Sequence, residues 1–229
     1  RDWRSDVCAS DLGDWMNMKD ERQFVGYSKY RSRLVDGHVH TELCPHGSGD
    51  RTAMMIEKAI ELRIEKVCLT EHAPLPKAFA VEYGGDQKAY DTASLKLNQV
   101  DSYLELGRQL QRAYGTHIDI SLGFEVDYIP GFETDIQEFL DRYGPLTDDN
   151  ILSVHFMEGV NNAFYCLDYS PEEFEKGFGP WIEKQYELYY KYYSTVRQAV
   201  RADLGEYTPK RIGHFDLIKK YQHHFGFEH

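Results

Sequence analysis

Three histidines lie close together near the start of the chain, at His38, His40 and His46. His38 and His40 are two residues apart, so on a β-strand both imidazoles would project from one face and could reach the same metal ion. Leu34 and Val35 can form such a strand, and the Gly- and Pro-containing stretch after it predicts a loop. A His-x-His pair is an ordinary event in a chain with ten histidines, so the metal interpretation needs support from other residues.

Other chemistry-bearing side chains repeat this pattern further along the chain. Four more apolar runs each end in a histidine or a glutamate, at His72, Glu125, His155 and His214. Any one of them alone is equally well explained as an isolated, hydrogen-bonded polar residue. Five such strand ends are harder to explain in that way, because unrelated histidines would scatter over both ends of the strands. We therefore expect these side chains to converge on one site.

The segments between the apolar runs predict helices. Apolar residues recur at helical spacing over residues 52–63, 94–114, 132–143 and 181–204, and Pro171 suits the first turn of a helix. Strands and helices thus alternate, which favours an α/β fold with a parallel sheet that is closed or nearly closed into a barrel. The ligand site of such a barrel lies at the carboxyl ends of its strands, where the histidines are expected.

The predicted ligand set also limits the choice of metal. It contains imidazoles and a carboxylate but no cysteine, which suits Zn, Mn or Fe and argues against a closed structural Zn site. The set exceeds what one ion can use, so we expect two or three divalent ions that share bridging ligands. Clustered ions would let an acidic protein bind a phosphate dianion and would activate water for attack on a phosphoester.

The composition excludes several classes of partner. The chain has 229 residues, a net charge of -12 and a pI of about 5.3, which argue against a nucleic-acid or anionic-membrane surface. No apolar stretch is long enough to span a membrane, and the cysteines at positions 8, 44, 68 and 166 form no Cys-x-x-Cys pair. We therefore expect a cytoplasmic protein whose partners are neither nucleic acids nor membranes.

Six short motifs, taken in order, resemble those of the polymerase-and-histidinol-phosphatase (PHP) superfamily. They are Asp-Gly-His-Val-His at 36–40, Cys-Pro-His-Gly-Ser-Gly at 44–49, Thr-Glu-His-Ala-Pro at 70–74, Gly-Phe-Glu-Val-Asp-Tyr at 123–128, Ser-Val-His-Phe at 153–156 and Gly-His-Phe-Asp at 213–216. The resemblance runs from about residue 34 to residue 221 and is strongest to the stand-alone histidinol-phosphatase branch. It implies a distorted (β/α)7 TIM-like barrel with a trinuclear metal centre. It also implies hydrolysis of L-histidinol phosphate to L-histidinol and phosphate in histidine biosynthesis.

The resemblance also implies roles for individual residues. The positions that match metal ligands of the family are His38, His40, His46, His72, Glu125, His155 and His214. Asp36 and Glu71 are expected to orient imidazoles. The candidates for binding phosphate are Arg211, Lys219 and Lys220. No catalytic group is expected beyond a metal-bound hydroxide, and His117, His223 and His224 are expected to lie away from the site.

The two ends of the sequence differ from the rest. Residues 1–30 lack the family's motifs, so we expect a non-family or artefactual segment there and assign the PHP domain to residues 31–229. The last metal motif of the family, Gly-Ser-Asp-x-His, is absent after His214. The expectation is therefore a barrel truncated at its C-terminus, without one Asp and one His ligand.

Two other functions stay open on the sequence alone. The ligands do not reveal the leaving group, so the alternative enzyme is another PHP-type phosphoesterase acting on nucleotides or oligonucleotides, although the chain has no basic stripe. A non-catalytic metal-binding domain is the alternative outside enzymes. For histidinol phosphate, Asp127 and Tyr128 are expected to form part of a wall around the substrate amine.

Overall fold

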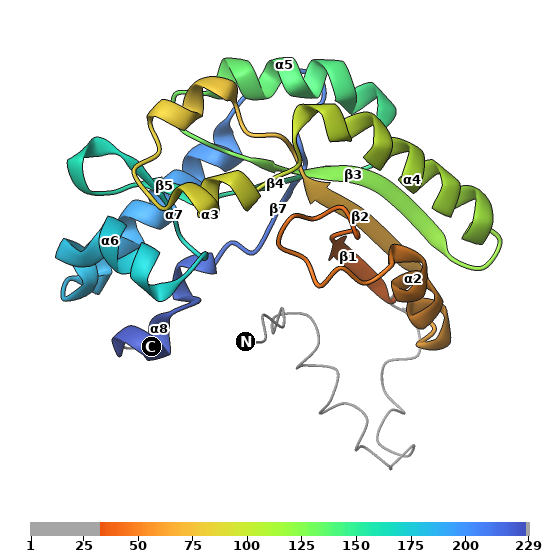
Figure 1. Ribbon diagram of the computed structural model, residues 1–229, viewed down its shortest axis with the longest axis horizontal. Helices are drawn as coiled ribbons and strands as arrows, with labels where there is room; N and C mark the ends of the chain where they lie inside the picture. The colour runs from red at the N-terminus through yellow and green to blue at the C-terminus, as the bar shows by residue number, and fades with distance from the viewer. Residues whose placement is uncertain (1–32, 228–229) are drawn as a thin grey trace, which may run out of the picture.

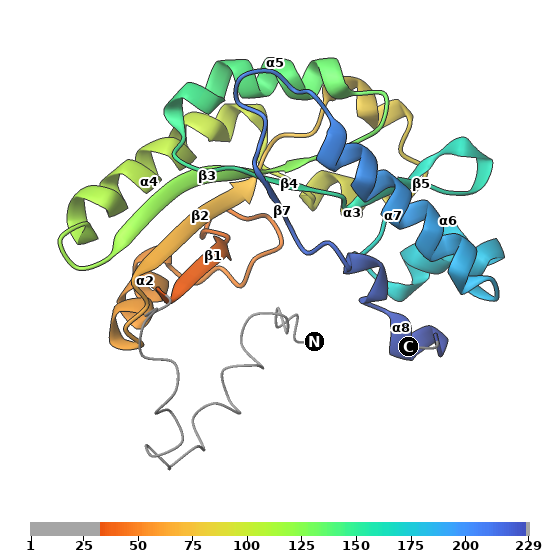
Figure 2. The same ribbon diagram turned by 180° about the vertical axis from the view of Figure 1, so that it is seen from behind.

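A curled parallel sheet carries the predicted site. In the computed structural model, which describes residues 33–227, the sheet consists of β1 (Val35–Val39), β2 (Lys66–His72), β3 (Asp119–Asp127), β4 (Ile151–Ser153) and β7 (Arg211–Ile212), in that order. All neighbouring strands pair in parallel. The guanidinium of Arg211 on edge strand β7 donates to the carbonyl of Gly37 on edge strand β1 at 2.9 Å. The two edges therefore approach each other across the curl that Figures 1 and 2 show.

Helices and short turns connect the strands. The longer helices are α2 (Thr52–Glu61), α4 (Val100–Tyr114), α5 (Glu133–Tyr143), α6 (Pro171–Ile182) and α7 (Gln185–Arg201), and the shorter ones are α3 (Gln87–Thr92) and α8 (Gln222–Phe225). The 3-10 turns are η1 (Lys77–Val81), η2 (Leu97–Gln99), η3 (Gly144–Leu146), η4 (Val160–Asn162) and η5 (Leu217–Lys219). In Figure 1, α4 and α5 lie over the same side of the sheet. The helices α6, α7 and α8 lie together at the left of the view, away from β1 and β2.

Strand β3 is the centre of the core because both of its faces are covered. All of its residues except Asp119 are buried, as is typical of an inner strand in a parallel sheet. Leu122 on β3 packs so tightly against Gly107 of α4 that a side chain on Gly107 would collide with it. The hydroxyl of Tyr103, also on α4, lies 3.1 Å from the carbonyl oxygen of Leu69 on β2. These contacts fix α4 against the strands that carry His72 and Glu125.

The helix predictions are confirmed with two adjustments. The helix expected over residues 94–114 begins at Val100, because Lys96 N donates to the side chain of Gln99 at 2.8 Å and a 3-10 turn precedes the helix. The helix expected over residues 181–204 is interrupted, since Lys184 has non-helical backbone angles and separates α6 from α7. Pro171 begins α6 as predicted, and Glu173 N donates to the capping Ser170 Oγ at 3.1 Å.

The predicted α/β class with a strongly curled parallel sheet is confirmed. Within residues 33–227 the sheet is an open half-barrel, because β5 (Phe156–Glu158) and β6 (Phe164–Cys166) pair antiparallel with each other and do not join it. The expected boundary near residue 30 lies outside the described residues. None of the helices described is both long enough and apolar enough to cross a membrane.

Candidate metal centre

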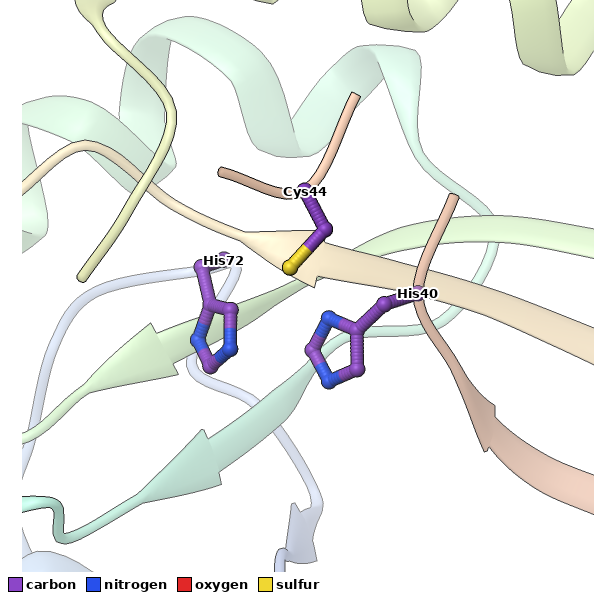
Figure 3. Close-up of side chains that lie close together, drawn as sticks. All are labelled: His40, Cys44 and His72. Atoms are coloured by element: carbon purple, nitrogen blue, oxygen red, sulfur yellow. The ribbon is translucent and has the colours of Figure 1, made fainter. Parts of the chain in front are cut away.

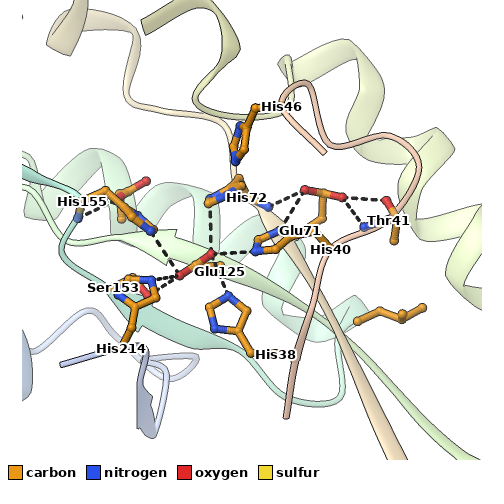
Figure 4. Close-up of polar contacts among 12 residues, drawn as sticks. His38, His40, Thr41, His46, Glu71, His72, Glu125, Ser153, His155 and His214 are labelled. Carbon is orange, nitrogen blue, oxygen red and sulfur yellow. Dashed lines mark hydrogen bonds and ion pairs between the residues drawn. The ribbon is translucent and has the colours of Figure 1, made fainter. Parts of the chain in front are cut away.

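The carboxylate of Glu125 lies among five imidazoles, as Figure 4 shows. Its side chain on β3 is fully buried. The Oε2 atom lies 2.9 Å from His38 Nε2, 3.3 Å from His40 Nε2 and 3.3 Å from His72 Nδ1. The Oε1 atom lies 2.9 Å from His214 Nε2 and 3.5 Å from His155 Nε2. One buried carboxylate is therefore shared by imidazoles from distant parts of the chain.

The carboxyl ends of the strands bring these side chains together. His38 lies on β1 and His40 directly follows it, while His72 is the last residue of β2 and pairs in register with Glu125. The remaining two, His155 and His214, follow β4 and β7. The structure thus places these predicted residues at one end of the sheet. Their role as metal ligands stays a prediction.

Two further carboxylates determine which nitrogen of an imidazole carries its proton. Asp127 Oδ1 lies 2.8 Å from His155 Nδ1, and Glu71 Oε1 lies 3.2 Å from His40 Nδ1. Because an ionised carboxylate only accepts hydrogen bonds, each contact favours a proton on Nδ1 and a lone pair on Nε2. Glu71 is itself fixed, since Oε2 accepts from Thr41 N at 2.8 Å and from Thr41 Oγ1 at 2.6 Å.

The resulting donor set fits divalent metal ions. The Nε2 atoms of His40 and His155 face oxygens of Glu125 at 3.3 and 3.5 Å, a contact that needs either a proton on Nε2 or a cation between the two atoms. Two ligand atoms about 2.1 Å from one Zn²⁺, at a tetrahedral angle, are about 3.4 Å apart. Ligand atoms lie within 4.8 Å of one another in the set His38, His40 and Glu125, and in the set Glu125, His155 and His214. Glu125 belongs to both sets and can bridge two ions.

The pKa values show how strongly the metal-free site attracts positive charge. Burial opposes ionisation of Glu125, but the charge of His155 and the other imidazoles holds its pKa well below the ordinary value. Burial also disfavours a proton on His155, yet the charges of Asp127 and Glu125 outweigh it and raise the pKa to about 10. For His40, hydrogen bonds with Glu125 and Glu71 overcome the effect of burial and raise the pKa to about 9. Metal ions would have to displace these protons.

His46 lies at the exposed rim of the site. Its Nδ1 is 2.8 Å from the carbonyl oxygen of Thr92, which can only accept, so Nδ1 carries the proton and Nε2 is left with a lone pair. The ring centroid of His46 is 4.9 Å from that of His72. The structure therefore brings His46 beside the cluster, although the four groups of potential ligands among residues 33–227 do not include it.

Two of the three basic residues predicted to bind phosphate, Arg211 and Lys220, contact acidic side chains. Besides Gly37, Arg211 contacts Asp149, with Nε 3.0 Å from Oδ2. Lys220 Nζ lies 3.4 Å from Asp168 Oδ2, and Lys219 is exposed at the end of η5. The role of all three in phosphate binding stays a prediction.

The remaining sequence-based expectations can be located in the same way. Asp36 is half-buried on β1, and burial raises its pKa while a backbone hydrogen bond at His38 opposes that effect. Its proposed role in orienting a ring stays a prediction. His117 is exposed before β3, at the opposite end of that strand from Glu125, and His223 and His224 are exposed on α8, as expected.

Sequence reasoning missed the contact of Asp127 with His155 and the role of Ser153. Asp127 contacts His155, and the Tyr128 hydroxyl donates to Glu133 Oε1 at 2.9 Å, while the wall that these two residues were expected to form around a substrate amine stays a prediction. Ser153 Oγ donates to Glu125 Oε1 at 2.5 Å. A signal for Asp127 was present, because it lies two residues after Glu125 on β3 and so shares its face of the strand.

Comparison with known families assigns residues 36–228 to the PHP domain. The chain belongs to the PHP domain family. Among relatives of this PHP chain, the histidinol-phosphatase of Bacillus subtilis is 38% identical over 188 residues, which are 81% of this chain and 67% of the relative. A Deinococcus radiodurans protein named "Probable histidinol-phosphatase" is 29% identical over 192 residues, covering 83% of this chain and 63% of the relative.

Solved structures support the same fold for this PHP chain. The crystal structure of a proposed histidinol phosphatase from Listeria monocytogenes matches with a TM-score of 0.79 and 40% identity, over 84% of this chain and 70% of that one. The histidinol phosphate phosphatase of Lactococcus lactis, solved with Zn, L-histidinol and phosphate, matches with a TM-score of 0.55 and 19% identity. That match covers 82% of this chain and 60% of the Lactococcus chain.

Proposed function

We propose that this PHP-domain chain is a metal-dependent phosphomonoesterase that hydrolyses L-histidinol phosphate to L-histidinol and phosphate, as a step of histidine biosynthesis. The observation that carries the proposal is the buried carboxylate of Glu125, shared by imidazoles at the ends of four other strands. Two or three ions of Zn, Mn or Fe would be held by His38, His40, His46, His72, Glu125, His155 and His214.

The chain's own residues prepare this site for ions and phosphate. Bound divalent ions would supply positive charge for the phosphate dianion and Lewis acidity toward water. Asp127 and Glu71 hold protons on Nδ1 of His155 and His40, so that both Nε2 atoms stay available. Ser153 fixes one oxygen of Glu125 through its hydrogen bond.

The proposed substrate rests on the relatives and on the charge of the molecule. The Bacillus subtilis relative is a histidinol-phosphatase, and the Lactococcus lactis structure of this fold contains L-histidinol and phosphate. A net charge of -12 disfavours an extended nucleic-acid substrate. Because this chain spans 67% and 63% of its Bacillus and Deinococcus relatives, the activity of the whole enzyme is part of the proposal.

Phosphate release by the metal-loaded chain tests this function. We expect kcat/KM for L-histidinol phosphate to exceed that for AMP or a short DNA strand by at least about tenfold. Glu125→Gln should lower the rate by more than about 100-fold, because even a contact that only supports a metal ligand is worth about 10- to 100-fold. His117→Ala, a change at the other end of β3, is the matched control and should leave the rate unchanged.

Other outcomes would assign another function. Faster hydrolysis of AMP or DNA would indicate a different PHP-type phosphoesterase. A chain that is fully loaded with metal and releases no phosphate from any of these compounds would indicate a non-catalytic metal-binding domain.

A further inference from the structure

A tight turn after β1 directs the thiol of Cys44 toward the metal centre. Cys44 N donates to Thr41 O at 3.0 Å, and Gly47 N donates to Cys44 O at 3.1 Å, so two successive turns fix this segment. A Cβ on Gly47 would lie only 3.1 Å from Cys44 Cβ, which shows how closely the second turn folds back. Figure 3 shows the sulfur pointing toward the imidazoles of His40 and His72. The side chain of Cys44 is buried, with 8% of its surface exposed.

The three side chains have the spacing of ligands to one ion. Cys44 Sγ, a ring nitrogen of His40 and a ring nitrogen of His72 all lie within 4.8 Å of one another. His72 is 6% exposed, and its Nδ1 lies 3.3 Å from Glu125 Oε2 but forms no hydrogen bond with the described residues. A buried polar atom without a partner is unfavourable and is uncommon in proteins. The unsatisfied nitrogen therefore indicates that a cation belongs between His72 and Glu125, next to the group that includes Cys44.

The alternative explanation is that Cys44 fills space as a small apolar side chain. Like Cys68, Cys44 belongs to neither of the two hydrophobic clusters, but among the described residues it is the one cysteine that belongs to a group of potential metal ligands. Cys166, by contrast, packs into the cluster around Phe79, Phe156 and Phe164. Cys166 therefore illustrates a structural cysteine in the same chain.

We propose that Cys44, His40 and His72 form a position with one sulfur and two nitrogen ligands for a thiophilic divalent ion at the rim of the Glu125 cluster. His40 would bind this ion in place of an ion shared with His38, because one ring nitrogen binds one ion. On binding, the metal–sulfur bond replaces the S–H bond and the proton passes to solvent. A thiolate ligand favours Zn²⁺, Cd²⁺ or Co²⁺ over Mn²⁺. The proposal deepens the proposed metal centre and changes the sequence-based expectation that no cysteine takes part.

Substitution of Co²⁺ tests this position without reference to catalysis. Metal-free protein loaded with Co²⁺ should show a near-ultraviolet charge-transfer band, which thiolate ligands give and imidazole or carboxylate ligands do not. Cys44→Ser should lose the band, whereas the matched variants Cys8→Ser, Cys68→Ser and Cys166→Ser should keep it. Absence of the band in the wild-type protein, or its persistence in Cys44→Ser, would overturn the proposal.

A second measurement avoids any dependence on the folding of Cys44→Ser. This measurement uses the Cys8→Ser protein, which retains Cys44 but lacks the cysteine outside the described residues. X-ray absorption of this protein loaded with Zn should show a sulfur neighbour at about 2.3 Å from Zn. A shell of nitrogen and oxygen only would contradict the proposal. Neither measurement uses phosphate release, so a cysteine-free metal centre that is still active would refute this inference and leave the proposed function intact.

Discussion

At the scale of single residues, the site is organised as pairs of a carboxylate and an imidazole. Asp127 fixes His155, and Glu71 fixes His40, so both rings present Nε2 toward Glu125. Glu125 is the residue that these pairs share. Each outer carboxylate therefore determines both the orientation and the protonation of a potential ligand.

Replacing Asp127 by Asn tests this pairing through pH. Asp127 and Glu125, against the effect of burial, raise the pKa of His155 from 6.5 to about 10 in the metal-free protein. Because the folded pKa lies above the unfolded one, the stability from this proton is fully present below about pH 6.5 and is lost as the pH rises toward about 10. The Tm of the metal-free protein should therefore fall above about pH 6.5, less steeply in Asp127→Asn, and metal affinity should drop about 10- to 100-fold in the variant.

Thermal unfolding between pH 6.5 and 7.5, together with chelator competition, gives both quantities; this range lies at least one unit below the ordinary pKa of thiols and tyrosines. Asp141→Asn, an exposed change on α5, is the control and should behave as the wild type. Equal pH slopes and equal metal affinities for Asp127→Asn and the wild type would show that Asp127 does not act through His155.

At the scale of elements, strand ends could be predicted from the sequence and contacts between distant segments could not. Apolar runs that stop at His72, Glu125 and His155 predict convergence, because parallel strands all end at one edge of a sheet. Arg211 had no such signal, since its partners Gly37 and Asp149 are 174 and 62 residues away. The direction of Cys44 likewise depends on a turn that composition and periodicity do not specify, whereas the two-residue spacing of Glu125 and Asp127 does place both on one face of β3.

The close approach of β7 to β4 gives a prediction at this scale. A methyl group on Gly213 would collide with Ser153 Oγ and come within 3.3 Å of Glu125 Oε1. We expect Gly213→Ala to displace the Ser153 hydroxyl from Glu125, lower the Tm and reduce metal binding. The control is Gly179→Ala on α6, where the nearest atom would be 4.0 Å away. Alanine there should change the Tm only slightly, because the gain from replacing a glycine inside a helix is offset by Pro180, which disfavours a side chain before it in the helical conformation.

Thermal unfolding and metal titration of both variants distinguish the outcomes. A Gly213→Ala protein with wild-type Tm and wild-type metal binding would mean that β7 tolerates displacement and does not shape the Glu125 site.

At the scale of the whole molecule, an acidic chain places six of its ten histidines at one end of a curled sheet. The net charge of -12 would repel a phosphate dianion unless positive charge were supplied locally. The imidazoles around Glu125 are placed to hold that charge as metal ions, and Arg211 joins the two edges of the sheet that carries them. A metal centre at this end of the sheet would therefore explain how a chain with a net negative charge could bind a phosphate dianion.

The number of metal ions bound per chain tests the central claim most directly. Elemental analysis after removal of free metal should give at least two divalent ions per wild-type chain, because Glu125 belongs to two sets of potential ligands. Glu125→Gln, which keeps the size of the side chain but removes its charge, should retain no more than one, and His117→Ala should match the wild type. A wild-type chain with one ion or none, or a Glu125→Gln chain with the wild-type number, would contradict a metal centre bridged by Glu125.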